Sequence, residues 1–204
     1  ALAKTYNTHA QTPDSAGTGT AMHTGVKTKA GVLGLDETVA RGDCSGVEAA
    51  MVADASEVFS GLGKSVGIIS TARLTHATPA SAYAHSADRN FESNDKLPEG
   101  CTQKDIAVQL IDAMEAGTVD IALGGGRRHF LPAEVEGNEG KSGKRTDGQN
   151  LIERAEGLGI TYVWNDETAA AADLSKPVRG LFESSHMKDE ADRTGEPSLA
   201  EMTE

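Results

Sequence analysis

The segment around Ser15 combines a hydroxyl nucleophile with the expected start of a helix. Residues 13–21 read PDSAGTGTA, which has the composition of a turn that enters a helix at Ser15. The first amides of a helix have no partners within it, and together with the helix dipole they favour a bound anion. The same residues also fit an ordinary helix cap by Asp14 or Ser15. The segment therefore predicts either an anion site or a structural cap.

If Ser15 is a nucleophile, its hydroxyl needs a base or a metal ion that favours the alkoxide. His23 would lie about two turns along the helix, too far to accept the Ser15 proton directly. No Ser-His-Asp or Ser-Lys arrangement is recognisable from spacing. Metal activation is therefore the chemistry that we expect for a catalytic Ser15.

Other glycine-rich and serine motifs fail on their spacing. A phosphate-binding loop ending at Gly63-Lys64-Ser65 would need a glycine where Val58 stands, and an apolar run follows this motif instead of preceding it. The glycines at 124–126 would need a further dinucleotide-motif glycine where His129 stands. A lipase-type elbow around Ser15 fails at Pro13.

The elements that must position Ser15 follow from apolar runs and helical patterns. Continuous apolar runs, typical of buried parallel strands, lie at 66–70, 119–123, 160–164 and 178–182. Helical patterns precede them at 47–59, 105–115, 148–156 and 167–172, and residues 197–204 begin a further helix with Pro197 near its first turn. This alternation predicts an α/β fold, with a layered, parallel-type sheet and helices on both faces.

The long irregular stretches at 71–100 and 127–146 are of a length typical of functional loops. The second is rich in charged residues, so we expect a charged surface insertion at about 127–146. We interpret residues 1–204 as part of one domain, because no repeat or linker forces a boundary. The absence of an initiator Met and of a first strand suggests an excerpt from a longer protein.

Composition limits the classes of partner. The net charge of −12 argues against nucleic acid, because binding phosphate backbones needs clustered Lys and Arg. No apolar run of about 18 residues is present, so the sequence predicts no membrane span and no intact signal peptide. Dispersed acidic residues and 4% aromatics would suit a salt-rich environment or a secreted protein. Cys44 and Cys101 are too far apart for a CxxC motif and fit either free thiols or a disulfide.

Several segments resemble alkaline phosphatases in the same order along the chain. They are residues 13–21, TGVKT at 24–28, GKSVGIISTARLTHATPA at 63–80, YAH at 83–85, DRN at 88–90, LGGGRR at 123–128, DG at 147–148, YVW at 162–164, GLF at 180–182 and PSL at 197–199. Each alone would be weak, but the collinear set spans nearly the whole chain and is specific. The resemblance implies an alkaline-phosphatase-like fold that is incomplete in this chain.

The resemblance also implies an activity and its residues. Alkaline phosphatases hydrolyse phosphate monoesters at alkaline pH through a phosphoserine intermediate. Ser15 would attack phosphorus and contact one zinc ion, Arg89 would hold two phosphate oxygens in its planar fork, and Asp14 would orient Arg89. Without the resemblance, Arg89 would be expected to form a surface pair with Asp88. The alternatives are a phosphodiesterase or sulfatase of the same superfamily, or a phosphate- or metal-binding fragment without turnover.

Further metal ions follow from the resemblance, which implies two zinc ions and one magnesium ion. His76 and Thr78 match the stretch that contacts the magnesium site, where zinc could compete because a histidine is present. Phe182, Glu183 and Glu196 resemble a peripheral calcium site, and plain surface acids are the alternative there. The family's remaining ligands, an Asp before the nucleophile and Glu, Asp and His groups after it, are absent from this chain. We expect zinc binding and activity to need those missing segments.

The family also suggests compartment and assembly. Cys44 and Cys101 fall where some members have a disulfide, which implies an exported protein, periplasmic or extracellular. The intact enzyme is expected to be a homodimer that takes phosphate monoesters and releases inorganic phosphate.

Overall fold

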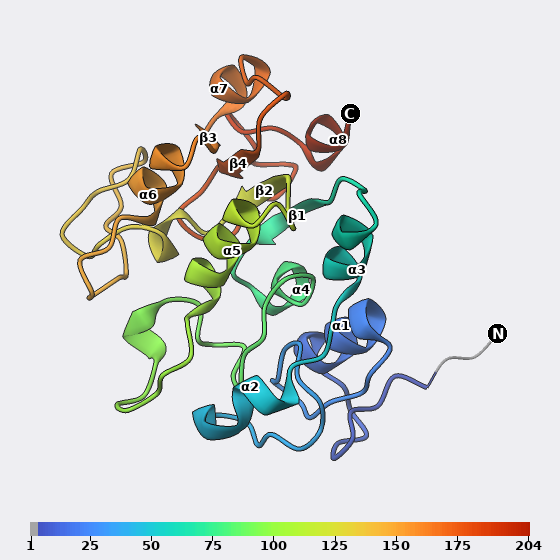
Figure 1. The fold of residues 1–204 in the computed structure, drawn as a ribbon. Helices are drawn as coiled ribbons and strands as arrows, with labels where there is room; N and C mark the ends of the chain where they lie inside the picture. Colours follow the sequence, from blue (N-terminus) through green and yellow to red (C-terminus); the bar gives the residue numbers. More distant parts are fainter. Residues whose placement is uncertain (1–3) are drawn as a thin grey trace.

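The computed structural model describes residues 4–204, in which parallel strands form a central sheet (Figure 1). The strands lie side by side in the order β1 (Gly67–Arg73), β2 (Ile121–Gly125), β4 (Val178–Leu181) and β3 (Thr161–Val163). Every pairing is parallel. The predicted apolar runs are therefore confirmed as strands of a parallel sheet, with small shifts at their ends.

Helices lie on both faces of this sheet. The helices of the described residues are α1 (Ser15–Thr24), α2 (Val47–Ala50), α3 (Ala55–Gly61), α4 (Ala77–Ala80), α5 (Ile106–Glu115), α6 (Leu151–Gly157), α7 (Asp166–Ala170) and α8 (Leu199–Thr203). Among them, α2 packs in a separate apolar cluster away from the sheet. Successive residues of a strand point to opposite faces. Ile68 and Ala122 pack in a cluster with α5 and α6, whereas their neighbours Ile69 and Leu123 pack with α7 and α8. The predicted layered α/β fold is confirmed.

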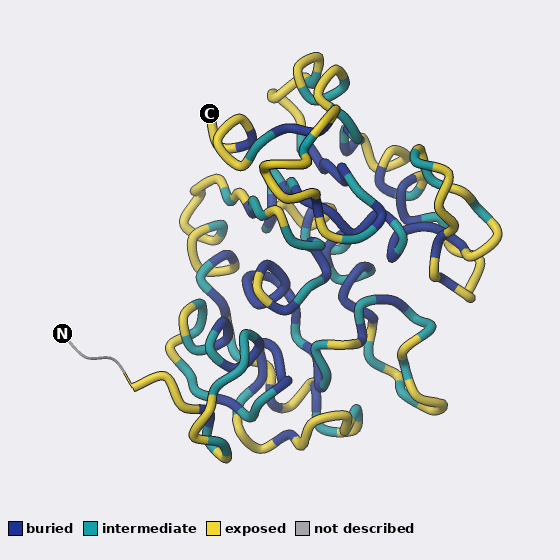
Figure 2. The backbone as a smooth tube through the Cα atoms, turned by 180° about the vertical axis from the view of Figure 1, so that it is seen from behind, coloured by how far each residue is buried: buried dark blue, intermediate teal, exposed yellow. Residues whose placement is uncertain are grey.

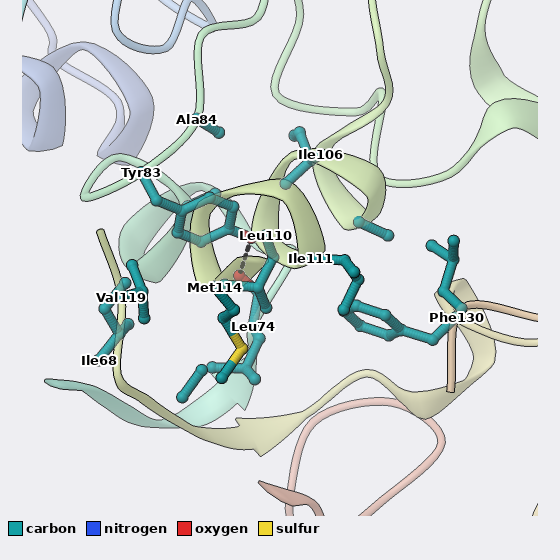
Figure 3. Packing of buried hydrophobic residues seen from close by; sticks show 14 of the residues in the cluster. Ile68, Leu74, Tyr83, Ala84, Ile106, Leu110, Ile111, Met114, Val119 and Phe130 are labelled. Carbon is teal, nitrogen blue, oxygen red and sulfur yellow. Dashed lines mark hydrogen bonds between the residues drawn. The ribbon is translucent and has the colours of Figure 1, made fainter. Parts of the chain in front are cut away.

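The larger core cluster lies between α5 and the sheet (Figure 3). Ile106, Leu110 and Met114 recur at helical spacing along α5 and are buried, which forms the apolar stripe of an amphipathic helix. The buried Tyr83 hydroxyl donates a hydrogen bond to the Leu74 carbonyl oxygen at 2.8 Å, drawn as the dashed line in Figure 3. This bond satisfies a buried polar group and ties the segment after α4 to the end of β1.

Two helices differ from their predicted bounds, one by an interruption and one at its start. The predicted helix at 47–59 is interrupted between α2 and α3, because the Asp54 carboxylate accepts the Glu57 amide and the two residues form a capping box that starts a new helix. Pro197 is not in the first turn of α8: Ser198 is its N-cap, so Pro197 lies outside the helix.

The stretch at 127–146, predicted as a charged surface insertion, is buried near both of its ends. Arg127 and Arg145 are 1% and 0% exposed. Arg145 donates to Asp105 at 3.0 Å, at the start of α5. The mostly exposed part is confined to about 133–144. Elsewhere, exposed backbone follows the outer loops and buried backbone concentrates around the sheet (Figure 2).

Cys44 and Cys101 form a disulfide bond, with their Cα atoms 5.5 Å apart. The pairing implied by the family resemblance is thus confirmed. The bond joins the segment before α2 to the loop before α5, which are 57 residues apart in sequence. Among the helices of the described residues, none has the length and apolar character needed to cross a bilayer.

Candidate active site

Ser15 is the first residue of α1, as the sequence predicts. The Asp14 carboxylate caps this helix by accepting a hydrogen bond from the Gly17 amide at 3.0 Å. The amides of Ser15 and Ala16 donate to no acceptor within residues 4–204. Asp14 is therefore a helix cap, and two backbone donors beside the Ser15 hydroxyl have no acceptor within the described residues, so the predicted anion site stays a prediction.

Small residues on α1 allow it to approach α4 closely. A Cβ atom on Gly19 would lie 2.4 Å from the Ser81 hydroxyl oxygen, just beyond α4, so only glycine fits at this contact. α4 follows β1 directly, with His76 at its N-cap position. The contact thus sets Ser15 beside the carboxyl end of a parallel strand, where ligand sites of α/β sheets usually lie.

Arg89 converges on Ser15 from a segment far along the chain. Its Nη1 donates to the Ser15 hydroxyl oxygen at 2.7 Å and to Asp14 Oδ2 at 3.2 Å. Gly31 holds both partners, because its amide donates to Asp14 Oδ2 at 3.0 Å and its carbonyl accepts the Arg89 amide at 2.8 Å. Gly31 has φ +82°, a backbone conformation that favours glycine. Ser15, Asp14 and Arg89 therefore share one site.

The alternative pairing of Arg89 with its neighbour Asp88 is not formed. Asp88 instead accepts two hydrogen bonds from Arg41, at 2.9 and 3.0 Å. Arg89 instead forms an ion pair with Asp14, and the Arg89 side chain is 21% exposed. A guanidinium that keeps this access to solvent can still reach an incoming anion.

The Asp14 carboxylate is held ionised. Partial burial opposes its charge, but hydrogen bonds from the Gly17 and Gly31 amides, from Arg89 and from Asn7 outweigh burial and keep the pKa of Asp14 below its usual value. An ionised Asp14 fixes the direction of the Arg89 fork at neutral and alkaline pH.

His76 lies on the other side of Arg89. Its Nε2 accepts a hydrogen bond from Arg89 Nη2 at 3.1 Å, and its Nδ1 is buried with no partner within the described residues. Burial, followed by the positive charges of Arg89 and Arg73, lowers the pKa of His76, so the ring is neutral. Arg89 thus contacts both the Ser15 hydroxyl and the His76 ring.

His186 is a site neighbour that the sequence reasoning missed. Its ring meets the His76 ring edge-on, with centroids 5.3 Å apart, and its Nε2 lies 2.7 Å from Arg73 Nη1. His76 and His186 follow the ends of β1 and β4, which meet at one edge of a parallel sheet. That shared edge was a signal that could have identified His186.

Glu92 anchors a second polar cluster next to these histidines, and it too was missed. It accepts two hydrogen bonds of 2.8 Å from Arg73 and one of 2.6 Å from Thr75, and His129 Nε2 lies 3.4 Å away. Burial opposes its charge, but Arg73, His129 and Thr75 lower the pKa of Glu92 to about 2. Burial lowers the pKa of His129 to about 4, so at neutral pH Arg73 supplies the positive charge. No local motif marks these residues, which come from separate segments.

Thr78 is less connected to the site than the other predicted residues are. It lies within α4, two positions after His76, and is exposed. Within residues 4–204 its side chain makes no hydrogen bond to Ser15, Arg89 or His76. The structure brings four of the predicted residues together and leaves Thr78 at the margin.

The residues expected to bind calcium lie together beyond the end of β4. Glu196 is 2% exposed; its Oε1 accepts the Lys188 amide at 2.7 Å, whereas its Oε2 is buried without a partner in the described chain. Burial and the negative charge of Glu183 raise the pKa of Glu196. Glu183 lies 3.6 Å from Lys141 Nζ and 3.8 Å from Lys188 Nζ, so two lysines compensate part of the negative charge.

The residues at Ser15 do not complete a zinc site. Catalytic zinc takes about three protein ligands. Here the Asp14 oxygens are engaged by backbone amides, Asn7 and Arg89, which leaves the Ser15 hydroxyl as a ligand. Because His76 Nε2 accepts from Arg89, the neutral ring carries its proton on Nδ1, which can donate a hydrogen bond to a water molecule of a neighbouring ion. The described residues around Ser15 alone therefore do not supply the ligands of a catalytic zinc ion.

Comparisons with known proteins show which family this chain resembles. The alkaline phosphatase family profile matches residues 1–204. The tissue-nonspecific alkaline phosphatase of Gallus gallus is 41% identical over 221 residues, covering 99% of this chain and 42% of the relative. The membrane-bound alkaline phosphatase of Bombyx mori is 41% identical over 219 residues, covering 100% of this chain and 40% of the relative. The crystal structure of Thermus thermophilus alkaline phosphatase is 28% identical with a TM-score of 0.76, over 99% of this chain and 36% of that chain.

The chain spans about two fifths of the length of the curated relatives it matches. The solved structure is likewise matched over only part of its length. The family profile nevertheless covers every residue of this chain, including the segments that supply Ser15, His76 and Arg89. This chain belongs to the alkaline phosphatase family.

Proposed function

We propose that the protein containing this chain hydrolyses phosphate monoesters at alkaline pH, with Ser15 as the nucleophile. The observation that carries the proposal is the contact of 2.7 Å between Arg89 Nη1 and the Ser15 hydroxyl, at a helix start with two free amides. A phosphate placed there would meet a nucleophile, a planar cation and backbone donors together. The shared name of the relatives favours this activity over a phosphodiesterase, a sulfatase or a binding domain without turnover.

In this proposal Arg89 binds two non-bridging phosphate oxygens and Asp14 keeps the guanidinium in place. The Ser15 oxygen attacks phosphorus, the alcohol leaves with the bridging oxygen, and water then releases inorganic phosphate from the phosphoserine. The amides of Ser15 and Ala16 stabilise negative charge that develops on the phosphoryl oxygens. Two zinc ions and one magnesium ion, held mostly by segments outside this chain, would supply activation of the hydroxyl and further positive charge.

We also propose how the remaining ligands are distributed. His76 would contact the magnesium site through a water molecule that accepts from its Nδ1–H, which has no partner within the described residues, and Thr78 would reach the site after a side-chain movement. Calcium would bind at Glu183, Glu196 and the Phe182 carbonyl, because the unpartnered Glu196 Oε2 would gain a cation. Residues 1–204 would be part of one domain of an exported, homodimeric enzyme, periplasmic or extracellular, for which the disulfide is support.

The test is to trap the phosphoserine. Protein that includes the missing segments is incubated with zinc, magnesium and p-nitrophenyl phosphate, quenched in acid and analysed by peptide mass spectrometry. A phosphoryl group is expected on Ser15 and not on Ser65, an exposed serine remote from the site. Ser15→Ala should abolish labelling and turnover, whereas Ser65→Ala should leave both unchanged. Normal turnover by the Ser15→Ala variant would refute the assignment.

The 204-residue chain alone is expected to show weak zinc binding and a small fraction of the whole enzyme's rate, because Ser15 is its one ligand for catalytic zinc. Adding the missing segments as separate chains should restore metal affinity and turnover together. Zinc-dependent turnover by the isolated chain at an ordinary enzymatic rate, about 1–1000 per second, would show that the ligand count is wrong.

A further inference from the structure

Asp54, Glu57 and His85 bring one oxygen or nitrogen donor each to within 4.8 Å of one another. Within residues 4–204, this is the one place where three side chains of the His, Cys, Asp and Glu types gather in this way. All three line a cavity of about 610 Å³, which the Cys44 side of the disulfide also borders. The cavity does not contain Ser15, Arg89 or His76, so it is separate from the nucleophile site.

Each of the three side chains retains a donor atom after its structural bonds are made. The capping box of α3 uses Asp54 Oδ1 and Glu57 Oε2, and leaves the second oxygen of each carboxylate. His85 Nδ1 lies 2.8 Å from the Gly34 carbonyl oxygen, which can only accept, so Nδ1 carries the proton. The Nε2 lone pair of His85 is therefore free, and it faces Glu57 Oε1 at 3.8 Å. A backbone carbonyl that fixes the histidine tautomer is the usual second partner of a metal-binding histidine.

Asp54 supplies the independent sign that a cation belongs here. The residue is 2% exposed and its carboxylate accepts backbone amides of its own helix, but within the described chain no Lys or Arg pairs with it. Burial and the negative charge of Glu57 raise the pKa of Asp54. Buried carboxylates are normally paired with a cation or bound to a metal. The positive group at this cavity, Lys104, is already paired with Asp112 at 2.7 Å.

We propose that Asp54, Glu57 and His85 form a binding site for a divalent transition-metal ion of the zinc type. Two carboxylate oxygens and one imidazole nitrogen match zinc, manganese and cobalt better than calcium or magnesium, which prefer oxygen ligands alone. Metal bonds of about 2.0–2.2 Å require the donors to close together. Glu57 can make this movement, because its side chain is 46% exposed and its Oε1 has no other partner than His85.

The position of the site gives it a structural role. It joins the start of α3 to the segment that leads from His85 to Arg89, four residues later. At His85 that segment is also held by Gln109, which accepts the His85 amide at 2.8 Å and donates to the His85 carbonyl at 3.0 Å. An ion bound to His85 would brace the Arg89 segment against α3 and neutralise the Asp54 and Glu57 charges.

The test compares zinc binding by the 204-residue chain and by matched variants. After treatment with a chelator, zinc stoichiometry and affinity are measured by equilibrium dialysis, and cobalt is used as a spectroscopic probe. His76→Gln is included in every protein so that the nucleophile site does not contribute a histidine ligand. Glu57→Gln keeps the capping hydrogen bond through its amide oxygen but removes the charge. Glu48→Gln is the control, because Glu48 lines the same cavity outside the cluster.

The parent chain and Glu48→Gln should bind one zinc ion more tightly, by at least tenfold, than Glu57→Gln and His85→Gln. Cobalt should give visible absorption bands in the parent that are lost in His85→Gln, and zinc should raise the melting temperature of the parent but not of Glu57→Gln. Equal zinc affinity in the parent and Glu57→Gln would overturn the proposal, and so would cobalt bands that survive in His85→Gln. These outcomes do not depend on phosphatase activity, so the proposal can fail while the proposed function stands.

Discussion

Arg179 is a fully buried cation without an anionic partner, and we predict that its removal stabilises the protein. It lies on the central strand β4 and is 0% exposed. Its Nη1 donates to the Leu151 carbonyl oxygen at 3.2 Å, while Nε and Nη2 have no partners within the described residues. The guanidinium carbon lies 5.5 Å from the centre of the Phe130 ring and 5.5 Å from the centre of the Tyr162 ring.

The size of the effect follows from these contacts. Burial lowers the pKa of Arg179 from 12.5 to about 10, which corresponds to about 3 kcal/mol against the charged form in the folded state. This penalty is fully present below pH about 10, because the side chain is charged there in both folded and unfolded protein. The two ring contacts and one hydrogen bond return about 2 kcal/mol. Arg179→Met should therefore stabilise the chain by about 1 kcal/mol, or about 2–4 °C in melting temperature.

Arg145 offers a matched control, since it is equally buried but fully paired. Its guanidinium is bonded to Asp105 and Asp147, and Asp105 is only 2% exposed. Arg145→Met would leave a buried carboxylate uncompensated and should destabilise by about 3–5 kcal/mol. Urea unfolding at pH 7, followed by circular dichroism, measures both variants. A loss of more than about 2 kcal/mol in Arg179→Met would refute the reasoning, because it would mean that the ring contacts outweigh desolvation.

Three further predictions concern the polar cluster and the helix contact at the site. The pKa of His129 is about 4 in the folded state, below its usual 6.5, so between these pH values the unfolded chain binds more protons than the folded one. The free energy of unfolding should therefore fall by about 3 kcal/mol from pH 6.5 to 4. Urea titrations at several pH values should show that this free energy depends less on pH in His129→Gln. The pKa of Glu92 is lowered from 4.5 to about 2, so the ionised Glu92 stabilises the folded protein above pH 4.5 and this stabilisation should be lost as pH falls to 2. Glu92→Gln should therefore destabilise the protein at pH 7 but little at pH 2. Gly19→Ala would set a methyl group 2.4 Å from the Ser81 hydroxyl oxygen and should cost about 1–3 kcal/mol by separating α1 from α4. The double variant with Ser81→Gly should recover most of this loss in the same unfolding assay, and no recovery would place the cause elsewhere.

The sheet could be predicted because its signal is local. Continuous apolar runs such as 119–123 identify strands with no solvent face, and their alternation with helical patterns fixes the parallel arrangement. The strand order, with β4 between β2 and β3, could not be read in this way, because pairing depends on long-range contacts. The break before Asp54 was missed because residues 47–59 satisfy a helical apolar pattern, while the capping box is a competing local signal.

The site could be predicted where one segment carries both the reactive group and its support. Asp14 and Ser15 are adjacent, and a helix start is recognisable from composition. The place of Arg89 came from the family resemblance alone, since nothing in its local sequence indicates a contact with residues about 75 positions earlier. Glu92 and His186 had neither a motif nor a matched segment to mark them, and only the folded sheet edge brings them beside His76.

The charges around Ser15 explain why this chain provides only part of the expected chemistry. Arg73 is neutralised by Glu92, and Arg89 is shared with Asp14. His76 is neutral, because burial and the neighbouring guanidinium groups lower its pKa, so it adds no positive charge at alkaline pH. A phosphate dianion attacked by a serine alkoxide would then face one guanidinium and two helix amides. In the proposed reaction, phosphoryl transfer would need more charge to be neutralised than this set supplies, and we propose that metal ions and the segments that bind them would supply the rest.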